Sequence, residues 1–511
     1  MSEAALMTTV STMVKEELPV LFLEYLQKVD PYYVGISRSS IGVNRSKVGR
    51  GWKVMHRFRT SISGQYEPAN PDANTAADAT NKSVMAYGSL QSFPKPLNTP
   101  HKGSMVRTID LNCHVGNFGL PTHVLQLAAM SPIAAEDIAD DLRGLAEIRA
   151  RGEAISFYTG NKFLGVVSEE STAAATTGHT IYTAVTLKPD SSRISWFTEG
   201  MLVNIYDDED ATTLINFTSS AGDLPLVVDA VDLVNGTITI KSLLDNTTLD
   251  HASNGLADAG IANGQYIFPH TTAATTASAG YKWGHFGLDD WIKSSGQILE
   301  ATMQGRLDTS AAAFSLATYP GFKSVIVTDN AGPLTETVLN NVIGAFVDAY
   351  GNTLDTLITT RRVIQKFLEQ PTLGNSRMNY DRTSKPLSIA SGWNTVTYEY
   401  EGRTLEVKIS SYCQSGVLYG IKMGEGNITR YIPPRSIGIG GISGPGSRDD
   451  LGEEIQFINP YGGTNGIFSL TSDTSGRKQP MVEAPFEQYS QIAPKDVRGI
   501  KISGITESTE I

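Results

Sequence analysis

The sequence has very little cysteine and no long hydrophobic run. Only Cys113 and Cys413 occur among 511 residues, too few for a disulfide framework, and they form no CxxC pair that would predict a zinc site. The most apolar stretch near the start, Leu18 to Leu26, is short and contains Glu24. A signal peptide would be basic at its start, and a membrane span needs about 20 apolar residues. We therefore expect a protein made in a reducing cytoplasm, with neither feature.

Motifs of common catalytic sites are also missing. No GxSxG, HExxH or GxxxxGK[ST] motif occurs. In the glycine-rich stretch Ile437 to Gly446, the third glycine of a dinucleotide fingerprint falls on Ser443, so a surface loop is favoured. His285, Asp289 and Asp290 could form part of a metal site, but without a further ligand at a recognisable spacing a structural histidine is favoured. The sequence predicts no enzyme, catalytic residue, cofactor or metal.

Negative charge is absent from one segment of an acidic chain. Between Pro31 and Tyr66 there is no Asp or Glu. This basic arm carries seven cations: Arg38, Arg45, Lys47, Arg50, Lys53, Arg57 and Arg59. Because the whole chain carries −12, the arm leaves −19 on the rest.

Two interpretations of the basic arm stay open. Basic residues that alternate with Trp and Phe can bind nucleic acid. The arm can instead lie on an acidic neighbour, such as another copy of this chain. The acidic helix face that we expect to serve there consists of Glu136, Asp137, Asp140 and Asp141.

The arm leads into an expected pair of strands. At 511 residues the chain exceeds one hydrophobic core and predicts about three domains, or one large domain with insertions. Trp52 to Arg59 alternates between apolar and basic residues, and Thr108 to Val115 alternates in the same way. The stretch between them, Gln65 to Met105, can bury little, so it is either disordered or lies on another chain.

A long helix is expected after these strands. Ser131 is a favoured N-cap with proline at the first turn, and the helix would run to Phe157. Acidic residues near its start and basic residues further along suit the helix dipole. Its expected apolar stripe is Ile138, Leu142, Leu145, Ile148 and Ile155. A stripe on one side predicts a helix that lies across a sheet or a neighbour.

An all-β segment follows. Two low-complexity stretches, Ser171 to Thr180 and Thr271 to Gly280, have the composition of paired linkers. Between them the pattern predicts strands, with a type I′ turn at Asn235-Gly236. We expect Ile181 to His270 to be a small inserted β domain.

The next part predicts a layered α/β unit. A helix over Leu334 to Phe346 should end at Gly351, followed by a buried strand over Leu354 to Ile358. Thr360 should then cap a second helix. A β-hairpin over Val396 to Ile409, turning at Glu401-Gly402, completes the unit.

Arg361 and Arg362 open the second helix at the end that is less favourable for cations. The apolar stripe lies on the opposite side. This placement favours either a carboxylate from another subunit or a merely solvated face.

Taken in order, these elements resemble the major capsid proteins of tailed bacteriophages, which have the Hong Kong 97-type capsid fold. The resemblance covers roughly Tyr32 to Lys495. It rests on the basic arm, the strands WKVMHRF and TIDLNCHV, the helix SPIAAEDIADDLRGLAEIRARGEAISFY, the module TVLNNVIGAFVDAYGNTLDTLITTRRVIQKFLEQ and the hairpin TVTYEYEGRTLEVKI.

The resemblance, together with the inserted β domain that goes beyond the family's simplest pattern, implies an α+β fold with six parts. These are an N-terminal arm (1–50), an extended β loop (51–115), a peripheral domain with a spine helix (116–180), the inserted all-β domain (181–270), an axial domain with return strands (281–435) and a C-terminal part of the axial and peripheral domains (436–511). In the family the extended loop lies over the adjacent subunit, which would explain why the loop is so poor in apolar residues.

The function that the resemblance implies is structural. Copies would form pentamers and hexamers of an icosahedral virion capsid that encloses double-stranded DNA, assembled in the host cytoplasm without a membrane. An acidic body suits a shell that does not bind its packaged DNA tightly. Portal, scaffolding and decoration proteins are further implied partners. Because only about thirty residues precede the arm, a separate scaffolding protein or a cleaved precursor is expected.

Three further possibilities accompany this expectation. Some family members crosslink through a loop lysine, for which Lys82 is a candidate, although nothing nearby in the sequence supports that chemistry. An encapsulin-like compartment would share the fold and hold cargo enzymes. An α/β carbohydrate-active or ligand-binding protein with a β accessory domain is the alternative from another class.

Overall fold

The computed structural model describes residues 18, 20–26, 28, 36–45, 52–63, 101–121, 132–160, 163–169, 174–175, 181–187, 193–207, 218–219, 222–223, 226–233, 237–242, 263–269, 285–296, 298, 316–317, 320–328, 330, 332–351, 354–368, 378–380, 396–424, 426–434, 455–457, 469–472 and 478–507. Several sequence predictions fall outside these ranges: Gln65 to Pro100 of the long loop with Lys82, the Asn235-Gly236 turn, the stretch Thr271 to Gly280 and the glycine-rich stretch Ile437 to Gly446.

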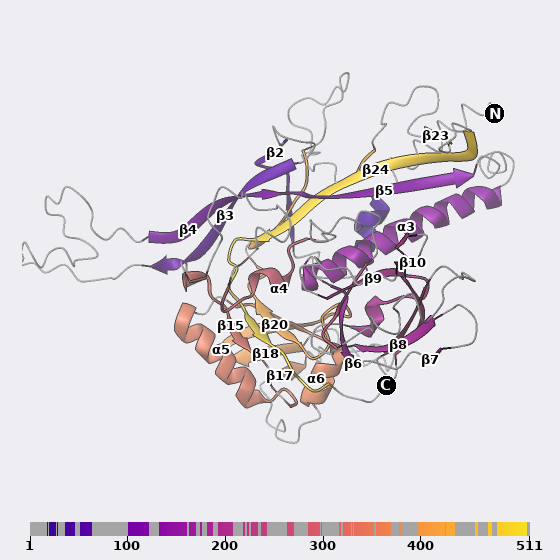
Figure 1. The fold of residues 1–511 in the computed structure, drawn as a ribbon. Helices are drawn as coiled ribbons and strands as arrows, with labels where there is room; N and C mark the ends of the chain where they lie inside the picture. Colours follow the sequence, from indigo (N-terminus) through magenta and orange to yellow (C-terminus); the bar gives the residue numbers. More distant parts are fainter. Residues whose placement is uncertain are drawn as a thin grey trace, which may run out of the picture.

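One long strand, β24 (Lys478–Pro494), organises the upper sheet in Figure 1. It pairs antiparallel with β5 (Asn112–Pro121), β21 (Ile428–Tyr431), β22 (Ile455–Phe457) and β23 (Ser469–Ser472), and β1 (Ser37–Ser39) pairs in parallel with β21. The predicted long helix is α3 (Pro132–Thr159), which runs alongside β24 and β5 (Figure 1).

The face that α3 buries includes Leu142 and Ile155 of the predicted stripe but excludes Ile148. Ile148 is 68% exposed, whereas Leu142 is fully buried. The buried row recurs every fourth residue: Leu142, Ala146, Ala150, Ala154 and Tyr158. Three alanines in this row let the helix approach its neighbours closely, so large apolar residues do not mark the buried side. The prediction for Ile148 was therefore wrong, because it took residue size as the sign of burial.

The arm strands form a ribbon. β3 (Trp52–Ser63) pairs antiparallel with β4 (His101–Asp110), from Lys53 opposite Asp110 to Ser63 opposite His101, and the short β2 (Val43–Arg45) covers only the start of β3. Figure 1 shows β3 and β4 leaving the body together. This β3–β4 ribbon buries Val54, Phe58 and Ile109 at its base.

The second predicted strand, Thr108 to Val115, is in fact two strands. β4 ends at Asp110 and β5 begins at Asn112. At the break, the Leu111 N–H donates to the Trp52 carbonyl at 2.8 Å, and the next residue, Asn112, is already in register with Ser490 of β24. The sequence pattern does not reveal this change of partner strand, because apolar and polar residues alternate with a period of two in both strands.

The predicted all-β segment supplies five of the six strands of a closed sheet. Its ring runs β13 (Thr237–Ser242), β12 (Leu226–Asp232), β9 (Leu202–Tyr206), β14 (Tyr266–Pro269), β6 (Gly165–Glu169) and β8 (Ile181–Leu187), and β8 pairs back to β13. Ring closure removes open strand edges. The barrel interior is filled by Val203, Ile205, Val228, Ile238 and Ile267, all buried.

This barrel does not start where the inserted domain was expected to start. β6 precedes Ile181, and Ala174 and Ala175 of the expected first linker form β7 against β8. The domain boundary itself stays a prediction. The short strands β10 (Thr218–Ser219) and β11 (Gly222–Asp223) pair with each other.

The predicted α/β unit is present as drawn in the lower part of Figure 1. Its sheet runs β15 (Val325–Val327), β25 (Ile500–Ile502), β20 (Leu418–Ile421), β16 (Thr356–Thr359), β19 (Arg403–Ile409), β18 (Val396–Tyr400) and β17 (Met378–Tyr380). Helices α5 (Glu336–Tyr350) and α6 (Arg361–Leu368) pack on it. The two predicted helices, the buried strand and the hairpin are confirmed.

Local signals explain why this unit was predictable. The Thr335 hydroxyl accepts from the Val338 N–H, and Gly351 ends α5 with φ of 75°. Glu401 and Gly402 both have positive φ, 46° and 75°, as the predicted hairpin turn requires.

The apolar stretch near the start is a core element. Its described residues are helical, and Leu18, Phe22 and Leu26, spaced four apart, are buried in the same cluster as Leu142 of α3. Within the described ranges, no helix is long and apolar enough to cross a membrane.

The end of α3 meets the start of α4 (Leu288–Trp291) without room for a side chain at Gly287. A Cβ there would lie 2.1 Å from the Gly160 backbone nitrogen and 2.6 Å from the Ser156 carbonyl oxygen. Backbone atoms cannot swing aside, so we expect Gly287→Ala to lower the free energy of unfolding by at least about 1–3 kcal/mol. Urea denaturation would measure this loss of stability.

Gly144→Ala is the matched control for this substitution. It lies in the interior of α3, and its Cβ would meet nothing within 4 Å. Alanine should therefore stabilise the helix by about 0.5–1 kcal/mol. Equal denaturation midpoints for the two variants would contradict the steric argument.

Candidate assembly surface

The cations of the basic arm do not share one environment. Arg57 is exposed on β3, Lys53 is half-buried opposite Asp110, and Arg38 is half-buried on β1. The backbones of Arg45 and Arg59 lie in β2 and β3, but their side chains are outside the described part, as are Lys47 and Arg50 altogether. Within that part, Arg57 is the arm cation most accessible to another molecule.

The predicted acidic helix face lies on the first half of α3. Asp140 and Asp141 are exposed, and Asp140 already pairs with Arg143 of its own helix at 2.8 Å. Glu136 and Asp137 belong to α3, but their side chains are not described. Asp141 is therefore the described member best placed to meet a partner. That the arm of another copy reaches it stays a prediction.

Arg361 and Arg362 are both exposed in the first turn of α6. The Thr360 hydroxyl accepts from the Val363 N–H at 3.3 Å and donates to the Glu507 carboxylate at 2.5 Å. Glu507 thus places negative charge at the positive end of this helix, where the arginines alone would be unfavourable. This contact could not be predicted from residue patterns, since Glu507 lies 147 residues from Thr360.

A buried polar cluster joins α3 to the upper sheet. Glu153 is only 5% exposed, and its carboxylate accepts from Arg430 Nη1 at 3.1 Å and from Gln488 Nε2 at 3.2 Å. His285 Nε2 also contacts it. Burial alone would raise the pKa of Glu153, but the charge of Arg430 and the contact with His285 outweigh burial and hold the pKa well below its usual range.

His285, Asp289 and Asp290, the weighed metal candidates, have three different sets of partners. His285 contacts Glu153. Asp289 accepts from Tyr419 Oη at 2.7 Å and from Lys501 Nζ at 2.6 Å. Asp290 accepts from the Gly287 N–H at 2.9 Å. The described residues contain no group of three or more His, Cys, Asp or Glu side chains that could hold a metal ion.

His56 fastens the β3–β4 ribbon to the upper sheet. The ring, 1% exposed, donates from Nε2 to the Pro494 carbonyl at 2.9 Å, so Nδ1 accepts from the Tyr431 hydroxyl at 2.8 Å. A neutral imidazole satisfies both bonds. Burial lowers the pKa of His56 to about 4, against the opposing effect of the Pro494 hydrogen bond.

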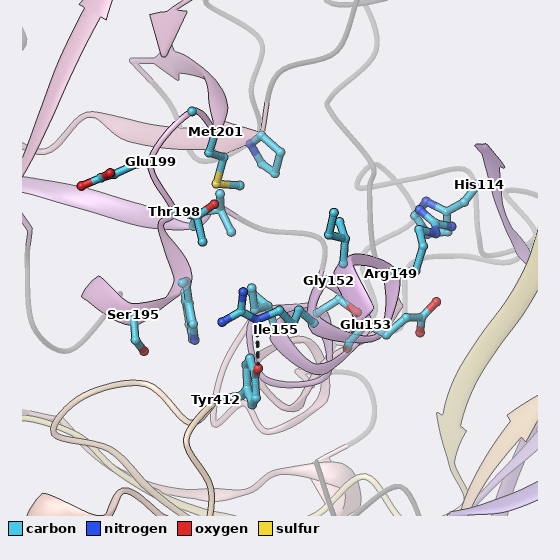
Figure 2. Close-up of a pocket in the computed structure, with 17 residues that line it drawn as sticks. His114, Arg149, Gly152, Glu153, Ile155, Ser195, Thr198, Glu199, Met201 and Tyr412 are labelled. Atoms are coloured by element: carbon cyan, nitrogen blue, oxygen red, sulfur yellow. Dashed lines mark hydrogen bonds between the residues drawn. The ribbon is translucent and has the colours of Figure 1, made fainter. Parts of the chain in front are cut away.

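A cavity of about 520 Å³ lies between α3 and the segment that precedes β9. Figure 2 shows Arg149, Gly152, Glu153 and Ile155 of α3 on one side and Ser195, Thr198, Glu199 and Met201 on the other. Arg151 Nε donates to the Tyr412 hydroxyl at 3.4 Å across it. Residue patterns gave no sign of this cavity, because its walls come from separate elements.

No protein-family model and no curated protein matches the sequence. Among solved structures, the chain is similar to the capsid asymmetric unit of cyanophage A-1(L), with 12% identity and a TM-score of 0.35 over 92% of this chain and 94% of that chain. The procapsid of satellite phage P4 with its size determination protein has 8% identity and a TM-score of 0.27, over 95% and 98%. An encapsulin complex from Synechococcus elongatus matches 36% of this chain and 56% of its own, with 12% identity and a TM-score of 0.21.

The predicted resemblance to phage capsid proteins is thus confirmed as a likeness. The mixture of helices and sheets also agrees with the predicted α+β class. The TM-scores of these three likenesses are all below 0.5, so they show no function for this chain.

Proposed function

We propose that this chain is a structural major capsid protein, many copies of which assemble as pentamers and hexamers into an icosahedral shell around double-stranded DNA. The observation that carries the proposal is the β3–β4 ribbon. Its outer half, Arg59 to Ser63, pairs with β4 alone among the described strands. A two-stranded ribbon is marginally stable in water by itself. A neighbouring copy that packs on it would supply the missing contacts.

The distribution of charge supports contact between like copies. The basic arm presents Arg57, and α3 presents Asp141, each exposed. A contact repeated in the same way from copy to copy closes into rings when the rotation allows it. An overall charge of −12 keeps the packaged DNA from binding the shell tightly.

Light scattering with negative-stain imaging of the purified chain tests the proposal. The chain would be produced alone and together with the products of its neighbouring genes, because scaffolding and portal proteins are the partners that such a shell would need. We expect pentamers, hexamers or closed shells in at least one of these conditions. A monomer in every condition would overturn the proposal.

Arg57→Glu should reduce assembly strongly. It reverses an exposed charge on the β3–β4 ribbon, so attraction to an acidic neighbour becomes repulsion. Raising the salt concentration should narrow the difference from wild type, because exposed charges are screened. Sedimentation of the particles would measure the effect.

Arg403→Glu is the control. It reverses the charge of another exposed arginine, on β19, and this variant should assemble normally. If Arg57→Glu formed particles as the control does at every salt concentration, the assembly role of the arm would be wrong.

An encapsulin-like compartment is the rival that shares the proposed architecture. The content of purified particles distinguishes the two functions. Particles that hold cargo protein and no nucleic acid would favour the compartment. A ligand-binding protein would instead be a monomer that binds a soluble ligand.

A further inference from the structure

The cavity beside α3 has the size and lining of a small-molecule site. Ligand pockets in proteins are commonly about 300–1,000 Å³ and mostly apolar, and this cavity measures about 520 Å³. Ile148, Gly152 and Ile155 line it from α3, while Met201 and Pro269 line it from the barrel. Ile148 is 68% exposed, so its side chain is accessible to a ligand that enters the cavity.

Of the two arginines that line the cavity, Arg151 is the exposed one. The exposed acid Glu199 also lines the cavity, on the opposite wall, and its carboxylate points away from Tyr412 in Figure 2. Arg149 donates to Gln488 Oε1 at 2.7 and 3.2 Å, and Glu153 is held by Arg430 and His285. Arg151 is exposed, and its hydrogen bond to Tyr412 is long at 3.4 Å. A guanidinium in this state can rotate to bind a carboxylate or a sulfonate through two N–H groups.

Trp196 adds an unsatisfied donor to the same lining. The residue is 3% exposed, and among the described residues its indole Nε1–H has no hydrogen-bond acceptor. A buried N–H without an acceptor is costly. An oxygen-bearing ligand that entered the cavity could relieve that cost.

We propose that this cavity binds a small amphiphilic anion, an apolar ring or chain that carries one acidic group. The apolar part packs against Ile148, Ile155 and Met201, and the acidic group binds Arg151. The positive side chain and the apolar lining together select this class over neutral apolar molecules and over small inorganic anions.

Gly152 provides the space for such a ligand. A Cβ at this position would meet no atom within 4 Å, although glycine weakens the middle of a helix. Leucine at Gly152 would fill the cavity and still suit the helix. Gly144 of the same helix is equally open but does not line the cavity, so Gly144→Leu is a matched control.

The test uses the purified full-length chain and the fluorescent anion 1-anilinonaphthalene-8-sulfonate. The bound dye is displaced with 2-naphthoate or with 2-naphthalenemethanol, which has the same rings and no charge. We expect the naphthoate to compete better. Arg151→Met should weaken naphthoate binding by about tenfold or more and leave the alcohol unchanged. Arg143→Met, which removes an exposed arginine of α3 outside the cavity, should stay within about twofold of wild type.

The cavity-filling variant decides whether the dye occupies this site. Gly152→Leu should abolish displaceable binding, while Gly144→Leu should bind as wild type does. The proposal is overturned if the acid and the alcohol compete equally in wild type, or if Gly152→Leu binds the dye as tightly as Gly144→Leu. Circular dichroism would verify that both leucine variants fold.

Discussion

Replacing Glu153 by Gln should destabilise this protein more than any other single polar substitution proposed for it. The change removes the carboxylate charge that pairs with Arg430, which is 1% exposed, so the buried guanidinium loses this ion pair. Breaking a buried ion pair from one side typically costs about 3–5 kcal/mol. The midpoint of urea denaturation, followed by tryptophan fluorescence, would show the loss.

Two further variants separate the ion pair from simple packing. Asp140→Asn removes the carboxylate of an exposed pair, Asp140 with Arg143, and should cost less than about 1 kcal/mol. In the double variant Glu153→Gln with Arg430→Met, no unpaired charge remains, so much of the stability should return. A double variant as unstable as the sum of its single variants would contradict the pairing.

The Glu153 carboxylate also predicts how stability depends on acid. Its pKa is lower in the folded chain than the ordinary value of 4.5, so the folded state binds fewer protons than the unfolded state below that pH. The stability that Glu153 contributes is complete above pH 4.5 and is lost as the pH falls further. Comparing the free energy of unfolding of wild type with that of Glu153→Gln, above and below pH 4.5, isolates this contribution.

Mild acid should destabilise the protein earlier, through His56. Its pKa is 6.5 in an unfolded chain and about 4 in the folded protein, because burial disfavours the charged ring. Between these values the unfolded state takes up a proton that the folded state does not. Stability is therefore complete above pH 6.5 and falls towards pH 4, by about 3 kcal/mol in all.

Substitutions around His56 test the assignment. In His56→Gln, denaturation midpoints should change much less between pH 6.5 and pH 4 than in wild type. Tyr431→Phe removes the hydrogen bond to Nδ1 but leaves the titrating ring in place, so the dependence on pH should persist. An unchanged pH profile in His56→Gln would refute the role of this side chain.

The α/β unit was predictable because its signals are local. Thr335 and Thr360 begin their helices, Gly351 ends one, and Glu401-Gly402 turns the hairpin, each with a backbone geometry that a few neighbouring residues impose. The long helix α3 was predicted nearly to its ends for the same reason.

The alanine row on the buried face of α3, the break at Leu111 and the ring closure of the barrel were not predictable. Each depends on which element packs or pairs with which, and no single segment records that choice. Ile148 has the character of a core residue and is exposed, whereas Ala146 and Ala150 are buried because the partner surfaces lie on their side.

The buried polar clusters were not predictable either, because their members are far apart in the sequence. In the sequence, Glu153 is one acidic residue among several on a long helix. Its partners His285, Arg430 and Gln488 lie 132, 277 and 335 residues away. His56 lies in a strand with an alternating pattern, and its contacts, Pro494 and Tyr431, lie 438 and 375 residues away.

The sequence by itself determined the helices and hairpin with local caps and turns, the basic arm in an acidic chain, and the likeness to phage capsid proteins. Those features depend on the spacing and charge of residues along the chain, which are visible in the sequence itself. The tertiary structure alone decided that the alanines of α3 are buried while Ile148 is exposed, which partners Glu153 and His56 contact, and that a cavity lies beside Arg151. Such features arise when surfaces distant in sequence come together, because burial and hydrogen bonding depend on the neighbour as much as on the residue.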